Sequence, residues 1–572
     1  MKRLKYSIQS KASMYNLYIL VTAFVILVSS ACTKQLDVKD PNDPTFGVNV
    51  TNEAGITAYA MGSVYWNGFS YGDGWLGDSY FSLPWGYREL MGDVVGGGQG
   101  SNNQTTTMGV PDSFIADPAN PSTTTFNNPS PQATGIIRGF NDPASTVNGN
   151  NALYYEWANM YAMINGCNLA LEQLANIKTL TADKVKTVQA WCYWWKGFAY
   201  AELGSLYYAG LIEDKSATIV SKFVDHNALI AESNKQLNLA MTTLTSIGNQ
   251  GDYAAVIGAL IPAQNQVGLG KAPSSAQWIR SINTMMARNI LVNKLAPFVN
   301  GNLSATISKA SIGVMGASDW ADVIKYTTAG IQKGDYVFSG RSSNTNSFFS
   351  AGSGTVASIC AQSNQNTTYK ISERLVSAFG KGDARLANFS DADGVFYGDA
   401  NTNTTRWSLL DGAVAKLAGI PILGSKSPGA IEIYIGPSYE ENALMAAEAN
   451  IRTGAIATGT GLIDAVRTSQ GAGVAKIASG VTAVQAMTEL TNERYAALAF
   501  RGLSYFDARR WGWTYSTANG GGRYGATLIY NKVIYTNAKI NYNFMDYWDV
   551  PNDELVKNPA ATGSAATKNP NW

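Results

Sequence analysis

Apolar residues recur at helical spacing along most of this chain, and this periodicity constrains its fold more than any other feature. Leu153, Trp157, Met160 and Ile164 share one helical face, and the segment from Val185 to Leu206 repeats the pattern. These two segments are expected to form an antiparallel pair. Similar spacing predicts further helices near 52–66, 80–95, 228–247, 277–296, 319–333, 438–453, 461–468 and 483–500. A chain of 572 residues is long for one core, so several cores or a stacked helical array is expected.

Capping residues mark several of these helix ends. Ser438 to Glu441 and Thr482 to Gln485 both fit the capping-box pattern, in which the first side chain bonds the backbone three residues on. Ser318 is expected to cap a helix that ends at Gly334. Helix pairs of this kind predict a mainly α fold with tetratricopeptide-like stacking.

Three long stretches rich in Gly, Asn, Ser and Thr interrupt the helical segments, at 96–150, 335–370 and 388–436. Loops of that length are usually functional or disordered. We therefore expect a helical scaffold that carries elaborate loops.

Composition excludes several kinds of chemistry. Lys and Arg number 42 against 41 Asp and Glu, so no excess positive charge is present for a nucleic-acid backbone. The only histidine is His226, which rules out a two-histidine zinc motif. Four cysteines, Cys32, Cys167, Cys192 and Cys360, form no C-x-x-C pair, and those at 167 and 192 lie in apolar helical patterns typical of buried thiols. No cofactor and no metal site are expected.

The N-terminus has the pattern of a signal peptide. Basic residues without an acid precede a 12-residue run, Leu17 to Val28, broken only by Thr22, and the run is too short for a membrane span. Ser29-Ser30-Ala31-Cys32 follows, which predicts a leader at 1–31 and lipidation of Cys32; ordinary cleavage after Ala31 is the alternative. Residues 32–50 suit an extended lipidated tether, because they combine prolines and aspartates with little apolar content.

A set of motifs in the C-terminal third resembles one known family. The segments are NERYAALAFRGLSYFDARRWG (Asn492 to Gly512), YEENALMAAEANIRTG (Tyr439 to Gly454), YWDVPNDELVKNP (Tyr547 to Pro559) and NPNW (Asn569 to Trp572). Taken in chain order, they are similar to the signature of the SusD/RagB nutrient-binding lipoproteins. Further matches from Trp157 onward extend the resemblance, so that it covers Cys32 to Trp572.

The resemblance implies a fold and a function. Residues 51–572 would form a single SusD-like domain, and the protein would be a non-catalytic lipoprotein of a Bacteroidota-type outer membrane. It would capture oligosaccharide at the cell exterior and close as a lid over a SusC-like TonB-dependent transporter. Some members of the family capture peptides instead. No dense acidic segment follows Cys32, so the residues leave a periplasmic orientation open.

Binding of a sugar requires flat aromatic rings edged by hydrogen-bonding groups. The candidate ligand-binding residues are Trp75, Tyr80, Trp85, Tyr87, Tyr397 and Trp407. The first four lie between two early helices, where the resemblance places sugar-stacking aromatics. Trp85 and Tyr87 are equally consistent with core positions at the start of a helix.

We expect the charged residues of the signature to have a structural role and not a catalytic one. Glu493, Arg494, Asp507, Arg509 and Arg510 are expected to pair with each other and fix helix packing. Two alternatives to carbohydrate binding stay open: a glycoside hydrolase, because two carboxylates suffice for that reaction, and a helical-repeat scaffold that binds only protein. The scaffold gives no reason for long loops rich in aromatics and Asn.

Overall fold

A computed structural model of the chain describes residues 50–65, 85–97, 108–128, 133–142, 151–294, 315–340, 369–391, 405–409 and 433–570. The predicted leader, Cys32 and all but the last residue of the predicted tether lie outside this part of the chain. Two compact units are present, residues 1–56 and 57–572. The described part of the first unit is short, and in it the Asn52 side chain accepts a hydrogen bond from the Gly55 backbone at 2.9 Å.

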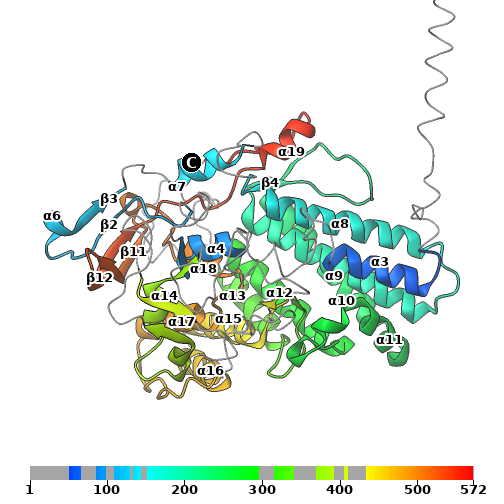
Figure 1. Cartoon of the computed structure of the whole chain (residues 1–572). Helices are drawn as coiled ribbons and strands as arrows, with labels where there is room; N and C mark the ends of the chain where they lie inside the picture. The colour runs from blue at the N-terminus through cyan, green and yellow to red at the C-terminus, as the bar shows by residue number, and fades with distance from the viewer. Residues whose placement is uncertain are drawn as a thin grey trace, which may run out of the picture. The chain divides into compact units, whose positions relative to one another are not determined.

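The described part of the chain is mostly helical, which confirms the predicted fold class (Figure 1). The longer helices are α3 (Glu53–Tyr65), α7 (Ala133–Phe140), α8 (Tyr154–Leu174), α9 (Ala182–Leu206), α10 (His226–Thr245), α11 (Gln250–Leu260), α12 (Ser275–Lys294), α13 (Ala317–Thr328), α15 (Tyr439–Arg452), α16 (Ile456–Ser469) and α17 (Ala483–Ala497). The shorter ones are α4 (Gly86–Met91), α6 (Pro121–Thr124), α14 (Glu373–Ala378), α18 (Ser504–Arg510) and α19 (Asn552–Lys557). Each segment that apolar spacing assigned to a helix overlaps one of these. Short 3-10 turns lie at Ala263–Asn265, Gly268–Gly270, Ala384–Asn388 and Thr517–Asn519.

The first long helices pair as predicted. Trp157 near the start of α8 packs on Tyr207 just after α9, with ring centroids 5.1 Å apart. The Tyr207 hydroxyl also donates to the Leu153 carbonyl and accepts from the Trp157 backbone N–H. The beginning of one helix therefore meets the end of the other, and the pair is antiparallel.

An aromatic core forms where α9 meets α12. Trp191, Trp194 and Trp195 on α9 and Trp278 on α12 are all fully buried. Phe338 lies among them, with ring centroids 5.2 to 5.7 Å from each. Edge-to-face contacts of this kind add to the free energy of burying the rings themselves.

Several helices that follow one another in the chain pack side by side. This holds for α9 with α10, α12 with α13, α15 with α16, and α16 with α17. The arrangement agrees with the predicted stacking of helix pairs, because each pair buries an apolar face that neither helix could bury alone.

Strands form small antiparallel pairs and one four-stranded sheet. The strands are β1 (Val95–Gly97), β2 (Ser113–Ile115), β3 (Thr125–Asn127), β4 (Ala209–Gly210), β5 (Val224–Asp225), β6 (Ser339–Gly340), β7 (Tyr369–Ile371), β8 (Phe389–Asp391), β9 (Trp407–Leu409), β10 (Ile433–Tyr434), β11 (Arg523–Tyr530) and β12 (Val533–Asn541). The pairs are β1 with β7, β4 with β5, β6 with β10, and β8 with β9, and the larger sheet has the order β11-β12-β2-β3. Asn531 and Lys532 form the turn of the β11–β12 hairpin, with φ of 48° and 64°. The sequence pattern did not predict this hairpin, because its turn lacks the glycine that usually marks one.

The start of α13 differs from its prediction. The helix begins at Ala317 with Gly316 as the capping residue, and the Gly316 backbone donates to the Asp319 carboxylate at 3.0 Å. Ser318 therefore lies inside the first turn and caps nothing. The helix also ends at Thr328, well before Gly334.

The other two predicted caps are present. Thr482 and Gln485 form the full reciprocal box, with hydrogen bonds of 3.3 and 2.9 Å. The Ser438 hydroxyl accepts from the Glu441 backbone, but the Glu441 carboxylate pairs with Arg288 at 2.6 Å instead of returning to the cap. A buried guanidinium competes successfully for that carboxylate, because it makes two charged hydrogen bonds.

Candidate functional site

One predicted ligand-binding aromatic lies in a defined polar setting, at the pairing of β8 with β9. Trp407 stands opposite Asp391 in this ladder. Its ring nitrogen donates to the Glu373 carboxylate at 3.1 Å, and the Arg406 backbone donates to the same carboxylate at 3.0 Å. We call Glu373, Asp391, Arg406 and Trp407 the Trp407 corner.

Glu373 is the fixed point of the Trp407 corner. It is 1% exposed and is the first residue of α14, where Ser372 caps the helix by accepting from the Arg374 backbone at 3.1 Å. Ser372 in turn donates its backbone N–H to the Val94 carbonyl at 3.1 Å, next to the β1–β7 pairing. The cap and the Val94 hydrogen bond thus fix the position of Glu373. The Glu373 carboxylate in turn sets the orientation of the Trp407 ring.

The outward side of the Trp407 corner is polar and partly exposed. The Arg406 guanidinium lies 5.2 Å from the centre of the Trp407 ring and within 3.5 Å of both carboxylates. Its side chain is 28% exposed and that of Asp391 is 34% exposed. A partly exposed indole edged by a guanidinium and a carboxylate can stack on the apolar face of a sugar and bond its hydroxyl groups.

Three of the other predicted ligand-binding residues, Trp75, Tyr80 and Tyr397, lie outside the described residues, as does Cys32. Trp85 and Tyr87, in contrast, are 3% and 0% exposed. Their side chains occupy the core position that was the alternative interpretation for both.

Trp85 has a structural partner in the signature segment. Its ring lies against Gly502, where an added Cβ would come within 2.8 Å of the ring. The Arg88 guanidinium donates to the Gly502 carbonyl at 3.2 Å, and the Glu89 carboxylate accepts from the Gly502 N–H at 2.7 Å. The first turn of α4 is therefore fastened to the turn before α18.

A small pocket beside Trp85 offers no alternative site for a sugar. It is lined by buried charged groups, among them Arg88, Glu202 and Arg288, with Glu202 2.6 Å from Arg88 and 3.9 Å from Arg288. The free space among these side chains has room for at most about one water molecule, far less than a sugar ring requires.

Burial shifts the ionisation of Glu89. Desolvation raises the pKa of its carboxyl to about 7, although hydrogen bonds from Gly502 and Ser504 and the charge of Arg88 act in the opposite direction. The folded state then binds the proton more tightly than the unfolded state. The contribution of Glu89 to the free energy of unfolding therefore falls as pH rises from about 4.5 to about 7, and stays constant above that range.

A Glu89→Gln variant is expected to show a weaker fall of stability across this pH range. At pH 8 it should gain up to roughly 3 kcal/mol over the wild type, because each unit of pKa shift corresponds to about 1.4 kcal/mol. Urea denaturation at pH 5 and pH 8 measures the difference. Glu213, whose pKa is also raised to about 7 by burial, remains to titrate in the variant. An unchanged pH dependence in the variant would contradict the assignment.

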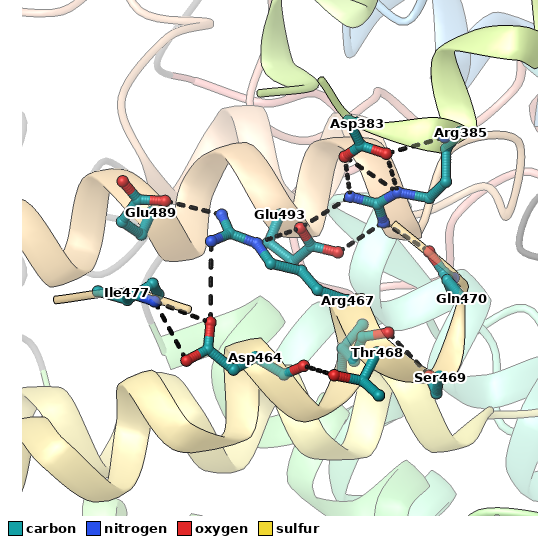
Figure 2. Close-up of polar contacts among 11 residues, drawn as sticks. Asp383, Arg385, Asp464, Arg467, Thr468, Ser469, Gln470, Ile477, Glu489 and Glu493 are labelled. Carbon is teal, nitrogen blue, oxygen red and sulfur yellow. Dashed lines mark hydrogen bonds and ion pairs between the residues drawn. The ribbon is translucent and has the colours of Figure 1, made fainter. Parts of the chain in front are cut away.

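Four of the five charged signature residues form ion pairs, as predicted, but with partners partly different from those expected. The prediction was wrong for Arg509, whose guanidinium donates to the backbone carbonyls of Ser205, Asp546 and Val292. Arg494 and Arg510 both pair with Asp507, at 3.0 and 2.7 Å. Glu493, however, pairs with Arg385 and Arg467 and not within the signature (Figure 2).

Figure 2 shows the ion pairs that surround Glu493. Arg385 donates to Glu493 and Asp383, both at 2.7 Å, and Arg467 donates to Glu493 at 2.9 Å and to Glu489 at 2.7 Å. Glu493 and Arg385 are 2% exposed. Each charge has an opposite partner, so this cluster joins α16 and α17 to the Ala384–Asn388 turn and serves packing.

The described segments contain neither a metal-binding cluster nor a membrane-spanning helix. In the segments that the structure describes, no group of three or more His, Cys, Asp or Glu side chains is arranged to hold a metal ion. Across the same segments, no helix combines the length and the apolar character needed to cross a bilayer.

This architecture is similar to that of known proteins. Residues 439–572 match the model of the SusD family. Among solved structures, a SusD superfamily protein from Bacteroides fragilis is 14% identical, with a TM-score of 0.53 over 90% of this chain and 99% of the other. A SusD-like carbohydrate binding protein from Bacteroides vulgatus is 13% identical, with a TM-score of 0.51 over 91% and 98%. Surface glycan-binding protein A from Bacteroides uniformis is 15% identical, with a TM-score of 0.50 over 89% and 98%. No curated protein matches the chain.

Identities this low establish the fold and not the ligand. The family model nevertheless matches the segment that contains the signature helices α15 to α18, and the fold likeness extends over most of the chain. Residues 439–572 therefore match the SusD family and the chain has a SusD-like fold, which confirms the resemblance seen in its motifs.

Proposed function

We propose that this protein binds carbohydrate at the cell surface and does not cleave it. The observation that supports this most strongly is the SusD family match of residues 439–572 within a chain that has the SusD-like fold. Two of the similar structures are named for carbohydrate or glycan binding. The ligand class is an oligosaccharide, and peptide capture is the outcome that would replace it.

The Trp407 corner is the proposed contact for the sugar. Its indole supplies the flat apolar surface, and Arg406 and Asp391 supply hydrogen bonds at the rim. Glu373 is buried and engaged by Trp407 and Arg406, which suits a positioning role for this carboxylate. Tyr397 and Trp75, which lie outside the described residues, would extend the site.

The remaining parts of the proposal concern the location of the protein in the cell and its partner. The leader at 1–31 would export the chain, lipid on Cys32 would anchor it in the outer membrane facing the exterior, and residues 33–50 would act as the tether. A SusC-like TonB-dependent transporter would lie beneath the protein and receive the captured sugar. The protein would act as the lid of this transporter. Purification from outer membranes should therefore recover a barrel-sized partner, and recovery of the protein alone would contradict this part.

Replacing Trp407 by alanine is expected to weaken glycan binding at least about tenfold, equivalent to roughly 1.4 kcal/mol. The loss follows from removal of the stacking surface. A Trp407→Phe variant keeps a ring but loses the bond to Glu373, so an intermediate affinity is expected. Affinity electrophoresis of residues 33–572 in gels that contain the bound polysaccharide measures all three proteins.

Trp513 provides the matched control. It is also partly buried, and the Arg523 guanidinium lies over its ring at 4.0 Å, as Arg406 does over Trp407. A Trp513→Ala variant should retain wild-type affinity. Equal losses at Trp407 and Trp513 would mean that the effect is general destabilisation, and unchanged binding in Trp407→Ala would move the site to other loops.

A further inference from the structure

Two thiols far apart in the sequence meet in the interior of the first helix pair. Cys167 lies on α8 and Cys192 on α9, and both are fully buried. The side chain of Cys192 is in hydrogen-bond contact with that of Cys167. The predicted burial is thus confirmed, and the two cysteines are also neighbours.

The antiparallel packing of α8 and α9 accounts for this meeting. Leu153 and Tyr207 mark one shared level, because the Tyr207 hydroxyl bonds the Leu153 carbonyl. Cys167 lies 14 residues along α8 from Leu153, and Cys192 lies 15 residues back along α9 from Tyr207. At about 1.5 Å per helical residue, both cysteines stand about 21 to 22 Å from that level. They face each other across the interface.

We propose that Cys167 and Cys192 become joined by a disulfide when the chain folds in an oxidising compartment. This inference rests on the export included in the proposed function, because disulfides persist outside the cytoplasm and not within it. The oxidant would be the disulfide of an exported thiol–disulfide oxidoreductase.

The reaction balances as two thiol–disulfide exchanges. The thiolate of one cysteine attacks a sulfur of the oxidoreductase disulfide, which breaks that S–S bond and forms a mixed disulfide. The second cysteine thiolate then attacks the sulfur of the first, which forms the Cys167–Cys192 bond and releases the oxidoreductase as a dithiol. Two cysteine thiols are oxidised, one disulfide is reduced, and the two protons pass to the oxidoreductase thiolates.

Burial determines when this reaction can happen. Within the folded helix pair neither thiol is exposed, and burial together with the neighbouring thiol raises the pKa of Cys192, which disfavours the reactive thiolate. Oxidation therefore takes place during folding, before α8 and α9 close. The bond would then link the two helices and restrict the unfolded chain between them.

The test compares one chain made in two compartments. Residues 33–572 with Cys360→Ser are produced in the cytoplasm and, behind a heterologous leader, in the periplasm of the same host. Each sample is denatured and alkylated without reductant, digested with trypsin and analysed by mass spectrometry. The exported sample should yield peptide 139–178 linked to peptide 187–196, and the cytoplasmic sample should yield both peptides alkylated. A folded exported chain with both cysteines alkylated would overturn the proposal.

A Cys192→Ser variant is the control, and it should abolish the linked peptide while leaving Cys167 alkylated. The full chain isolated from its native envelope separates this inference from the proposed function. A link that forms in the exported sample but is missing from the native protein would support the thiol pair and contradict export to an oxidising compartment.

Discussion

Replacing Glu448 with alanine is expected to lower the free energy of unfolding by about 3 to 5 kcal/mol, because Asp507 alone would then balance the buried charges of Arg494 and Arg510. Glu448 on α15 is fully buried and accepts two hydrogen bonds from Arg510 on α18, at 2.7 and 2.6 Å. Burial acts to raise the pKa of Glu448, but Arg510, Arg452 and Arg494 outweigh it and lower the pKa to about 2. Removal of the carboxylate would leave these guanidinium groups facing one another.

Chemical denaturation at pH 7 measures this loss, and Glu489→Ala is the matched control. Glu489 also pairs with an arginine, Arg467 at 2.7 Å, but its side chain is 41% exposed. Exposed pairs contribute about 1 kcal/mol or less. Losses of similar size in the two variants would show that the ion pair between Glu448 and Arg510 does not fasten α15 onto α18.

The Glu448–Arg510 pair also makes the free energy of unfolding depend on pH. Because the folded pKa of Glu448 is lowered from 4.5 to about 2, its contribution is complete above pH 4.5 and is lost as pH falls toward 2. Glu89 has the opposite dependence. The two carboxylates together favour a stability maximum in the mildly acidic range.

A Gly502→Ala substitution is expected to cost about 2 to 5 kcal/mol. Gly502 has φ of 68°, a left-handed conformation that costs other residues about 1 to 2 kcal/mol. The new Cβ would also meet the Trp85 ring at 2.8 Å, and such overpacking adds about 1 to 3 kcal/mol. Thermal and chemical denaturation of the variant measure the sum.

Gly454→Ala separates the two causes. Gly454 follows α15 with φ of 93°, and an added Cβ there meets nothing within 4 Å. This variant should therefore show the conformational cost alone. An equal loss at Gly502 would mean that Trp85 is free to move from the turn, and the structural role assigned to Trp85 would be wrong.

Helices were predictable from this sequence because each carries its own signal. In α8 and α9 the apolar stripe is long enough to identify both the helices and their pairing. The start of α13 was misplaced, because Gly316 and Ser318 both lie close to the first turn, and the hydrogen bond from the Gly316 backbone to the Asp319 carboxylate decides between them. The β11–β12 hairpin was missed, since its Asn531-Lys532 turn carries no strong local signal.

The candidate site was predictable only in part. Trp407 was proposed from the sequence because an aromatic in a polar loop has no helical face to bury. Glu373 was not found, since 34 residues separate it from Trp407 and only the folded chain brings them together. Trp85 and Tyr87 were candidates as well, although the sequence was equally consistent with core positions for both. Their burial depends on the distant Gly502 turn and the packing of α4, which no local pattern reveals.

The most direct test of the central claim is a glycan-array screen of residues 33–572, run beside a peptide array with the same labelled protein. Carbohydrate binding predicts saturable retention on a related group of oligosaccharides and none on peptides. Retention on peptides alone, or on neither array by protein that is folded and monodisperse, would contradict the claim.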